Sequence, residues 1–195
     1  MVIGITGGVG TGKSVVLTYL KENYNATLLM ADDIAKELLA PGKEANIKVR
    51  EIYPADLFTP DGEIKRKEMA HFIFHHPDKL KEQNDIVFPM VKQYIKNAIK
   101  GADGLVVVEA AVLIEEHYDE ICDVMWYIYS RCENRRERLK CNRGYSDDRI
   151  EAMMKCQLSE DEFRNHCQVV IDNDGELSDT YQQIDMQMKM LSEEK

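Results

Sequence analysis

Residues 7–14 of the chain read GGVGTGKS and fit the phosphate-binding pattern G-x-x-x-x-G-K-[ST]. An apolar run at residues 1–6 precedes them, and a helical pattern opens at Ser14. This order matters because the glycine-rich turn must aim backbone N–H groups and a helix N-terminus at one anion. Lys13 can reach the β- and γ-phosphates of a nucleotide, and the Ser14 hydroxyl can bind Mg²⁺. The pattern therefore predicts a P-loop that binds a nucleoside triphosphate.

Three carboxylates follow apolar runs that we expect to be strands. Asp32 and Asp33 come after residues 26–30, where open α/β sheets place their ligand crevice. Asp33 directly precedes a helix expected from Ile34, so we expect it to be the N-cap. Asp32 is then the candidate that orients an acceptor hydroxyl and accepts its proton. Glu109 closes another apolar run, and it is either a Mg²⁺ ligand acting through water or an ordinary strand-end acid.

Residues 131–143 form a basic stretch in an acidic chain. They carry six basic and two acidic residues, whereas the whole chain has a net charge of −10. Pairs spaced i,i+4 on a solvated helix face explain part of this pattern. For the group we predict a mobile lid whose arginines stabilise the transferring phosphoryl group, with Arg138 and Arg143 as the candidates.

The remaining patterns predict the elements that position these residues. The expected strands are residues 1–6, 26–30, 104–109, 124–129 and 168–171. The clearest expected helices are residues 13–22, 34–39, 64–74, 78–99 and 177–191, and the acidic end at 193–195 is expected to fray. Pro89 is expected to kink or divide the fourth of these helices. Strands alternating with helices predict an α/β fold, a doubly wound five-stranded parallel sheet of the P-loop kinase type.

The chain is expected to be one kinase domain over residues 1–195. Its core would comprise residues 1–42, 101–141 and 168–195. Helical patterns dominate residues 43–100, which we interpret as a substrate-binding subdomain, the alternative being a helical layer that merely covers the sheet. Residues 142–167 would be the lid.

Composition restricts the class of protein. A net charge of −10 disfavours nucleic-acid binding, which needs a cationic surface. The five cysteines include no C-x-x-C pair, so we expect reduced thiols in a cytoplasmic protein, although a zinc-bound lid is an alternative. That site would use Cys141, Cys156, His166 and Cys167. We expect no membrane span, and a monomer or weak homo-oligomer.

The same features select a reaction class. The guanine-recognition pattern N-K-x-D does not occur, which disfavours a GTPase, and an ATPase machine should be larger. The small size, helical insertion and basic lid together predict a small-molecule kinase that uses ATP and Mg²⁺.

Several segments, in order along nearly the whole chain, resemble dephospho-CoA kinases. The P-loop, residues 31–42 (compare D-A-D-x-I-A…P-G), residues 61–66 (compare D-G-x-[LI]-D-R) and residues 112–115 (compare L-L-[FY]-E) match in turn. Residues 171–175, read as IDNDG, are the most characteristic of these matches. The resemblance implies transfer of the γ-phosphate of ATP to the ribose 3′-hydroxyl of dephospho-CoA, the last step of coenzyme A biosynthesis. It also places the catalytic aspartate on Asp32.

Four departures from the family patterns fall on the acceptor and lid sides, at Met30, Phe88, Ala111 and Asn142. Two alternatives therefore stay open. One is another nucleoside or nucleotide kinase, and the other is an ATP-dependent sensor that has lost catalysis.

These arguments give four sets of candidate site residues. Candidate nucleotide-binding residues are Gly8, Gly10, Thr11, Gly12, Lys13, Ser14, Val15 and Asn173. Candidate catalytic residues are Lys13, Asp32, Arg138 and Arg143, and candidate metal ligands are Ser14 and Glu109. Asp32, Arg66 and Glu115 are the candidate substrate contacts.

Overall fold

The fold is known from a computed structural model that describes residues 1–193. Glu194 and Lys195, part of the end expected to fray, lie outside the described residues. The chain divides into a sheet-containing unit, Met1–Leu29 with Ala102–Lys195, and a helical unit, Met30–Gly101. We describe each unit by itself, and the roles of residues 43–100 and 142–167 stay predictions.

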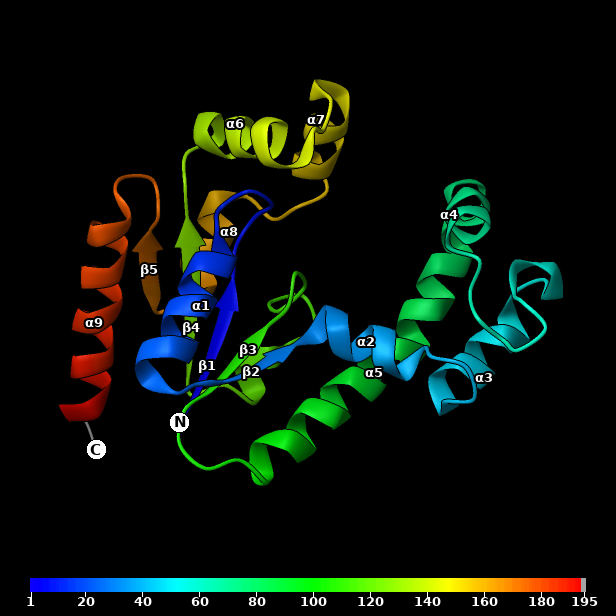
Figure 1. Cartoon of the computed structure of the whole chain (residues 1–195), viewed down its shortest axis with the longest axis horizontal. Coiled ribbons are helices and arrows are strands. Elements are labelled where there is room, and N and C mark those ends of the chain that lie inside the picture. Colours follow the sequence, from blue (N-terminus) through cyan, green and yellow to red (C-terminus); the bar gives the residue numbers. More distant parts are fainter. Residues whose placement is uncertain (194–195) are drawn as a thin grey trace. The chain divides into compact units, whose positions relative to one another are not determined.

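Five strands form one sheet in the order β2-β3-β1-β4-β5 (Figure 1). They are β1 (Val2–Thr6), β2 (Thr27–Met30), β3 (Val106–Glu109), β4 (Val124–Tyr129) and β5 (Val169–Asp172). Strand β1 pairs in parallel with β3 and β4, and β4 pairs in parallel with β5. The predicted five-stranded parallel sheet is confirmed, with strand ends within two residues of the expected ones.

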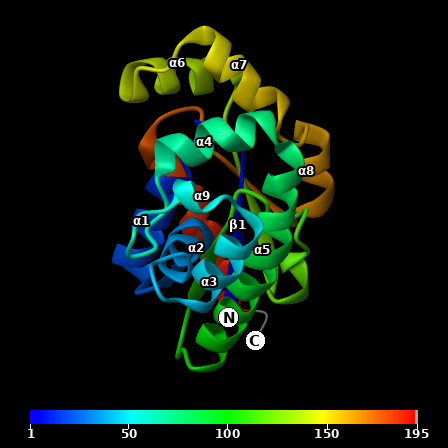
Figure 2. The ribbon, with the colours of Figure 1, turned by 90° about the vertical axis from the view of Figure 1, so that its right-hand side faces the viewer.

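Helices cover both faces of the sheet. Helices α1 (Lys13–Tyr24) and α9 (Leu177–Glu193) contact each other, and α8 (Glu160–His166) lies on the face opposite α1 (Figures 1 and 2). This cover explains why β1, β3 and most of β4 are buried along their length. On the α8 face, the Tyr127 and Phe163 rings stack with centroids 4.8 Å apart.

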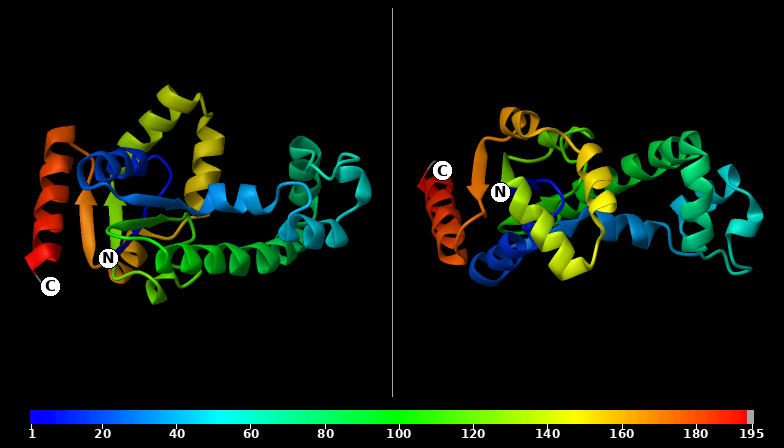
Figure 3. Two further views of the ribbon diagram at one scale, coloured as in Figure 1. Left: turned by 60° about the horizontal axis from the view of Figure 1, so that its bottom comes forward. Right: turned by 90° about the horizontal axis from the view of Figure 1, so that it is seen from above.

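Strands β3 and β4 flank β1, so their carboxyl ends and the P-loop share one edge of the sheet. Beyond that edge lie α6 (Cys132–Arg143) and α7 (Asp147–Lys155), which Figure 3 shows in yellow-green and yellow. Ion pairs join the two helices: Arg136 with Glu151, and Lys140 with Asp147 at 2.6 Å. A short 3₁₀ turn, η2 (Tyr118–Glu120), lies between β3 and β4.

The helical unit is organised around its longest helix. Its elements are α2 (Ala31–Leu38), α3 (Glu44–Ile52), the 3₁₀ turn η1 (Ala55–Leu57), α4 (Arg66–His75) and α5 (Pro77–Lys100). Helices α2, α3 and α4 pack against α5. The buried residues Val87, Val91 and Ile95 form the inner face of α5.

One local expectation was wrong, and another was wrong in one of its two alternatives. Helix α5 runs through Pro89 as one helix, so Pro89 does not divide it, and a kink at this position stays a prediction. Asp33 is not an N-cap: α2 begins at Ala31, directly after β2, with Met30 as its N-cap. Asp32 and Asp33 therefore occupy the first helical turn, where negative charge favours the helix dipole.

The burial of the sheet predicts that the same Ile→Ala substitution has a different effect on stability at a buried and at an exposed position. Ile128 in β4 is fully buried, so Ile128→Ala should lower the free energy of unfolding by about 2–5 kcal/mol. Ile47 in α3 is 51% exposed, and Ile47→Ala should change the free energy of unfolding by no more than about 0.5 kcal/mol. Urea unfolding monitored by circular dichroism measures both values. Equal effects would contradict the assigned core.

Candidate active site

The P-loop connects β1 to α1. Gly10 has a φ of 82° and Gly12 a φ of 85°, in the left-handed region that favours glycine. A side chain at Gly10 would also meet the backbone oxygen of Arg135, since a Cβ there would lie 2.8 Å from it. The Thr11 hydroxyl is buried and donates to the Gly8 carbonyl at 2.9 Å. The loop therefore has the compact shape that lets backbone N–H groups surround an anion.

Lys13 begins α1 and lies next to the end of β3. Its Nζ donates to the Gly7 carbonyl at 2.8 Å and is 3.6 Å from Oε1 of Glu109. Glu109 is 8% exposed and Ser14 is exposed. The predicted phosphate-binding lysine and both candidate metal ligands thus belong to the sheet-containing unit, near the same strand ends.

Asn173, just after β5, holds the second half of the P-loop. Its Nδ2 donates to the Thr11 carbonyl at 2.8 Å, and its Oδ1 accepts from the Thr180 hydroxyl at 3.0 Å. Arg138 on α6 donates to the Asn173 carbonyl at 2.7 Å and to the Thr11 carbonyl at 3.4 Å. Arg143 is exposed at the last residue of α6. Of the two lid arginines, the structure brings only Arg138 to the loop.

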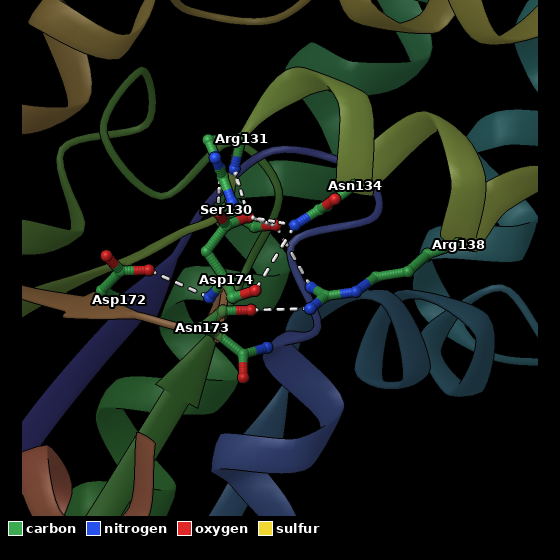
Figure 4. Close-up of polar contacts among 7 residues, drawn as sticks. All are labelled: Ser130, Arg131, Asn134, Arg138, Asp172, Asn173 and Asp174. Atoms are coloured by element: carbon green, nitrogen blue, oxygen red, sulfur yellow. Dashed lines mark hydrogen bonds and ion pairs between the residues drawn. The ribbon is translucent and has the colours of Figure 1, made fainter. Parts of the chain in front are cut away.

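Asp174 joins α6 to the loop after β5 (Figure 4). Its carboxylate accepts from the Ser130 hydroxyl at 2.9 Å, from Nδ2 of Asn134 at 2.8 Å, and from both the backbone N–H and Nε of Arg131. Burial by itself raises the pKa of Asp174, but these hydrogen bonds outweigh burial and lower its pKa to about 2. Asp174 is therefore ionised and fixes the start of α6.

Arg135 and Gln157 hold the first half of the P-loop, a role that the sequence did not indicate. Arg135 Nε donates to the Val9 carbonyl at 2.9 Å, and Gln157 Oε1 accepts from the Val9 N–H at 3.0 Å. Arg135 Nη2 also donates to Gln157 Oε1 at 2.9 Å. The local charge of residues 131–143 pointed to the right helix, but it could not separate Arg135 from its neighbours.

Glu115 lines a cavity of about 460 Å³ that lies within the sheet-containing unit. Gln157 and Phe163 contribute to the same cavity. The cavity thus extends from a residue that touches the P-loop to the segment after β3.

The remaining candidates lie in the helical unit. Asp32 and Asp33 are exposed on α2, and Asp33 pairs with Lys36 at 2.7 Å. Arg66 opens α4 and lines a second cavity of about 250 Å³ together with Lys36. Asp32 and Arg66 therefore belong to the helical unit, whereas the P-loop belongs to the sheet-containing unit.

Residues 1–193 contain no group of three or more His, Cys, Asp or Glu side chains arranged to hold a metal ion, so the alternative of a zinc-bound lid has no ligand set there. None of the helices in that range is long and apolar enough to cross a bilayer.

Sequence comparisons decide the family. A sequence model described as dephospho-CoA kinase matches residues 1–179. The chain is 33% identical to the dephospho-CoA kinase of Carboxydothermus hydrogenoformans, in an alignment that covers 94% of this chain and 90% of that relative. The chain belongs to the dephospho-CoA kinase family. The predicted resemblance is confirmed, and this family member is an ATP-dependent kinase.

Solved structures confirm the fold of this kinase. A Thermus thermophilus protein superposes with a TM-score of 0.84 at 24% identity, covering 98% of this chain and 97% of that one. Dephospho-CoA kinase from Campylobacter jejuni superposes with a TM-score of 0.73 at 17% identity, with the same coverage. At these identities the likeness concerns the fold alone.

The environment of Asp174 predicts a dependence of stability on pH. An unfolded aspartate has a pKa near 3.9, so between about pH 4 and pH 2 the unfolded chain binds more protons at this position than the folded one. The contribution of Asp174 is therefore complete above about pH 4 and is lost as the pH falls towards 2.

Urea unfolding measured from pH 2 to pH 6 tests the direction of this change in stability. Wild type should be more stable than Asp174→Asn above pH 4, and the difference should shrink towards pH 2. Asp103→Asn, at an exposed loop position, is the control substitution and should change the free energy of unfolding at pH 6 by no more than about 0.5 kcal/mol. A difference between wild type and Asp174→Asn that is constant with pH would contradict the assignment.

Proposed function

We propose that this protein transfers the γ-phosphate of ATP to the ribose 3′-hydroxyl of dephospho-CoA, giving ADP and CoA. In this reaction a bond forms between the 3′-oxygen and the γ-phosphorus, the bond to the β-phosphate bridging oxygen breaks, and the hydroxyl proton leaves. The observation that carries the proposal is the P-loop with Lys13 beside Glu109, in a member of the dephospho-CoA kinase family. The reaction is the last step of coenzyme A biosynthesis.

In the proposed complex, the ATP phosphates lie on the P-loop. Backbone N–H groups of the loop and the N-terminus of α1 bind the phosphate oxygens, and Lys13 leaves the Gly7 carbonyl for a phosphate. Asn173 lies beside the nucleotide because its side chain donates a hydrogen bond to the Thr11 carbonyl of the loop. The proposed nucleotide contacts are Gly8, Gly10, Thr11, Gly12, Lys13, Ser14, Val15 and Asn173.

Ser14 and Glu109 would hold a magnesium ion. A hydroxyl and a carboxylate are hard oxygen donors of the kind that Mg²⁺ takes alongside phosphate oxygens and water, so the residues present fit this ion. When bound, Mg²⁺ neutralises charge on the β- and γ-phosphates.

Asp32 would accept the proton of the acceptor hydroxyl, and Arg66 and Glu115 would contact the acceptor. Arg138 or Arg143 would stabilise the charge on the transferring group once residues 142–167 close as a lid. The helical unit would supply Asp32 and Arg66 to the reaction, and the sheet-containing unit would supply Glu115. We further propose a cytoplasmic, monomeric or weakly oligomeric enzyme that binds no nucleic acid.

The proposed function predicts which acceptor stimulates ATP turnover. ADP release from ATP and Mg²⁺ should rise strongly with dephospho-CoA and stay at its basal rate with adenosine, AMP or no acceptor. A coupled assay measures the four rates. Stimulation by adenosine or AMP instead would identify a different nucleoside or nucleotide kinase. Binding of ATP without stimulation by any acceptor would favour the sensor.

Asp32 and Asp33 offer a matched pair of substitutions on one helical turn. Asp32→Asn should lower kcat by about 10²-fold or more while ATP binding is retained, because the acceptor hydroxyl loses its proton acceptor. Asp33→Asn loses only the exposed pair with Lys36 and should keep near-normal kcat. Near-normal turnover of Asp32→Asn would remove this residue from the role.

A further inference from the structure

The cavity beside Gln157 has the size and the place of a ligand site. Its volume of about 460 Å³ lies in the range of small-molecule pockets. Its walls come from the segment after β3, from α7 with the turn that follows it, and from α8. All of these belong to the sheet-containing unit, so the shape of the cavity does not depend on the helical unit.

Gln157 fixes how far a ligand in this cavity lies from the P-loop. Its Oε1 accepts from the Val9 N–H, so a ligand against Gln157 is one side chain away from the loop. Asn173, the proposed nucleotide contact, instead bonds to Thr11 in the second half of the loop. The cavity and the proposed nucleotide side thus adjoin different halves of the P-loop.

The chemistry of the walls favours a flat, largely apolar ring that carries a hydrogen-bond donor. Most of the lining is apolar and includes Val112, Met153, Leu158 and Phe163. Phe163 is held in one orientation because Tyr127 stacks on it with ring planes 6° apart. Glu115 supplies a carboxylate that only accepts hydrogen bonds when ionised.

We propose that this cavity binds the adenine base of the acceptor, with Glu115 accepting a hydrogen bond from the exocyclic amino group. The inference rests on the proposed function and deepens it. In dephospho-CoA the adenine is attached to the same ribose as the reacting 3′-hydroxyl, whereas the pantetheine arm is separated from it by a pyrophosphate. The base is therefore the group that must lie next to the phosphate-binding loop during transfer.

Cys156 provides a probe of occupancy that does not depend on catalysis. Its exposed thiol lines the cavity, whereas Cys141 is exposed on α6 and does not line it. Without ATP, saturating dephospho-CoA should slow alkylation of Cys156 by about tenfold or more and leave Cys141 unchanged. Mass spectrometry of the two peptides measures both rates, with the reagent in large excess over the thiol of the acceptor.

Four outcomes of this experiment are decisive. Protection of Cys156 by dephospho-CoA but not by pantetheine supports the adenine site. Equal protection by pantetheine overturns it in favour of the arm. Turnover of dephospho-CoA without protection overturns this inference alone, whereas absence of both stimulated ADP release and protection overturns the proposed function together with it.

The role of Glu115 is tested by comparing acceptors that carry different bases. Wild type should prefer dephospho-CoA over its hypoxanthine analogue by about tenfold or more in kcat/KM, since a carboxylate cannot accept from the hypoxanthine carbonyl. In Glu115→Gln the amide can pair with either base, so this preference should fall to near unity, while KM for ATP is unchanged.

Glu137→Gln is the matched control, because Glu137 is exposed on α6 and does not line the cavity. It should keep the wild-type preference for adenine. An unchanged preference in Glu115→Gln would overturn the assignment of this carboxylate to the base.

Discussion

The site depends on one requirement: the P-loop must keep several backbone N–H groups aimed at one point, and its own side chains add few hydrogen bonds to hold them there, such as the one from Thr11 to Gly8. The structure meets it with hydrogen bonds from distant segments. Gln157 and Arg135 hold Val9, and Asn173 holds Thr11, each across more than a hundred positions of sequence. The loop is therefore rigid before any ligand binds, which reduces the entropy that binding must offset.

A second set of hydrogen bonds links the segments that fix the P-loop to one another. Arg138 bonds to both Asn173 and Thr11, and Asp174 fixes the start of the same helix through Arg131. Helix α6, the P-loop and the turn after β5 thus share one hydrogen-bond network. Figure 4 shows the part of it that joins α6 to the turn after β5. In such a network the removal of one member leaves others without partners, so the arginines of α6 serve structure and candidate chemistry together. This sharing explains why a basic helix persists in an acidic chain.

The distribution of the candidate residues over two units is consistent with the proposed reaction. Phosphate binding needs a fixed cradle, and Lys13 and Glu109, 3.6 Å apart at the sheet edge, are the side chains that we propose for it. Positioning an acceptor alcohol needs groups that can approach that cradle, and the exposed Asp32 and Arg66 lie on a helical unit with its own packed core. With this distribution, substitutions at Asp32 and Arg66 leave the P-loop unit unchanged, whereas the proposed base site at Glu115 belongs to the same unit as the loop.

The sequence by itself determined the P-loop, the five strands, their alternation with helices and the family, because each depends on local patterns such as glycine spacing and apolar runs. Predictions from local sequence rules were wrong where contacts with other parts of the fold decided the local structure. Asp33 was expected to be an N-cap, but β2 runs directly into α2. Pro89 was expected to kink or divide its helix, and α5 continues through it without division. Only the tertiary structure decided that Arg135 and Gln157 hold Val9 and that a cavity adjoins them. The physical reason is that hydrogen bonds between segments far apart in sequence leave no periodic signal in either segment, and they exist only once the sheet has brought the segments together.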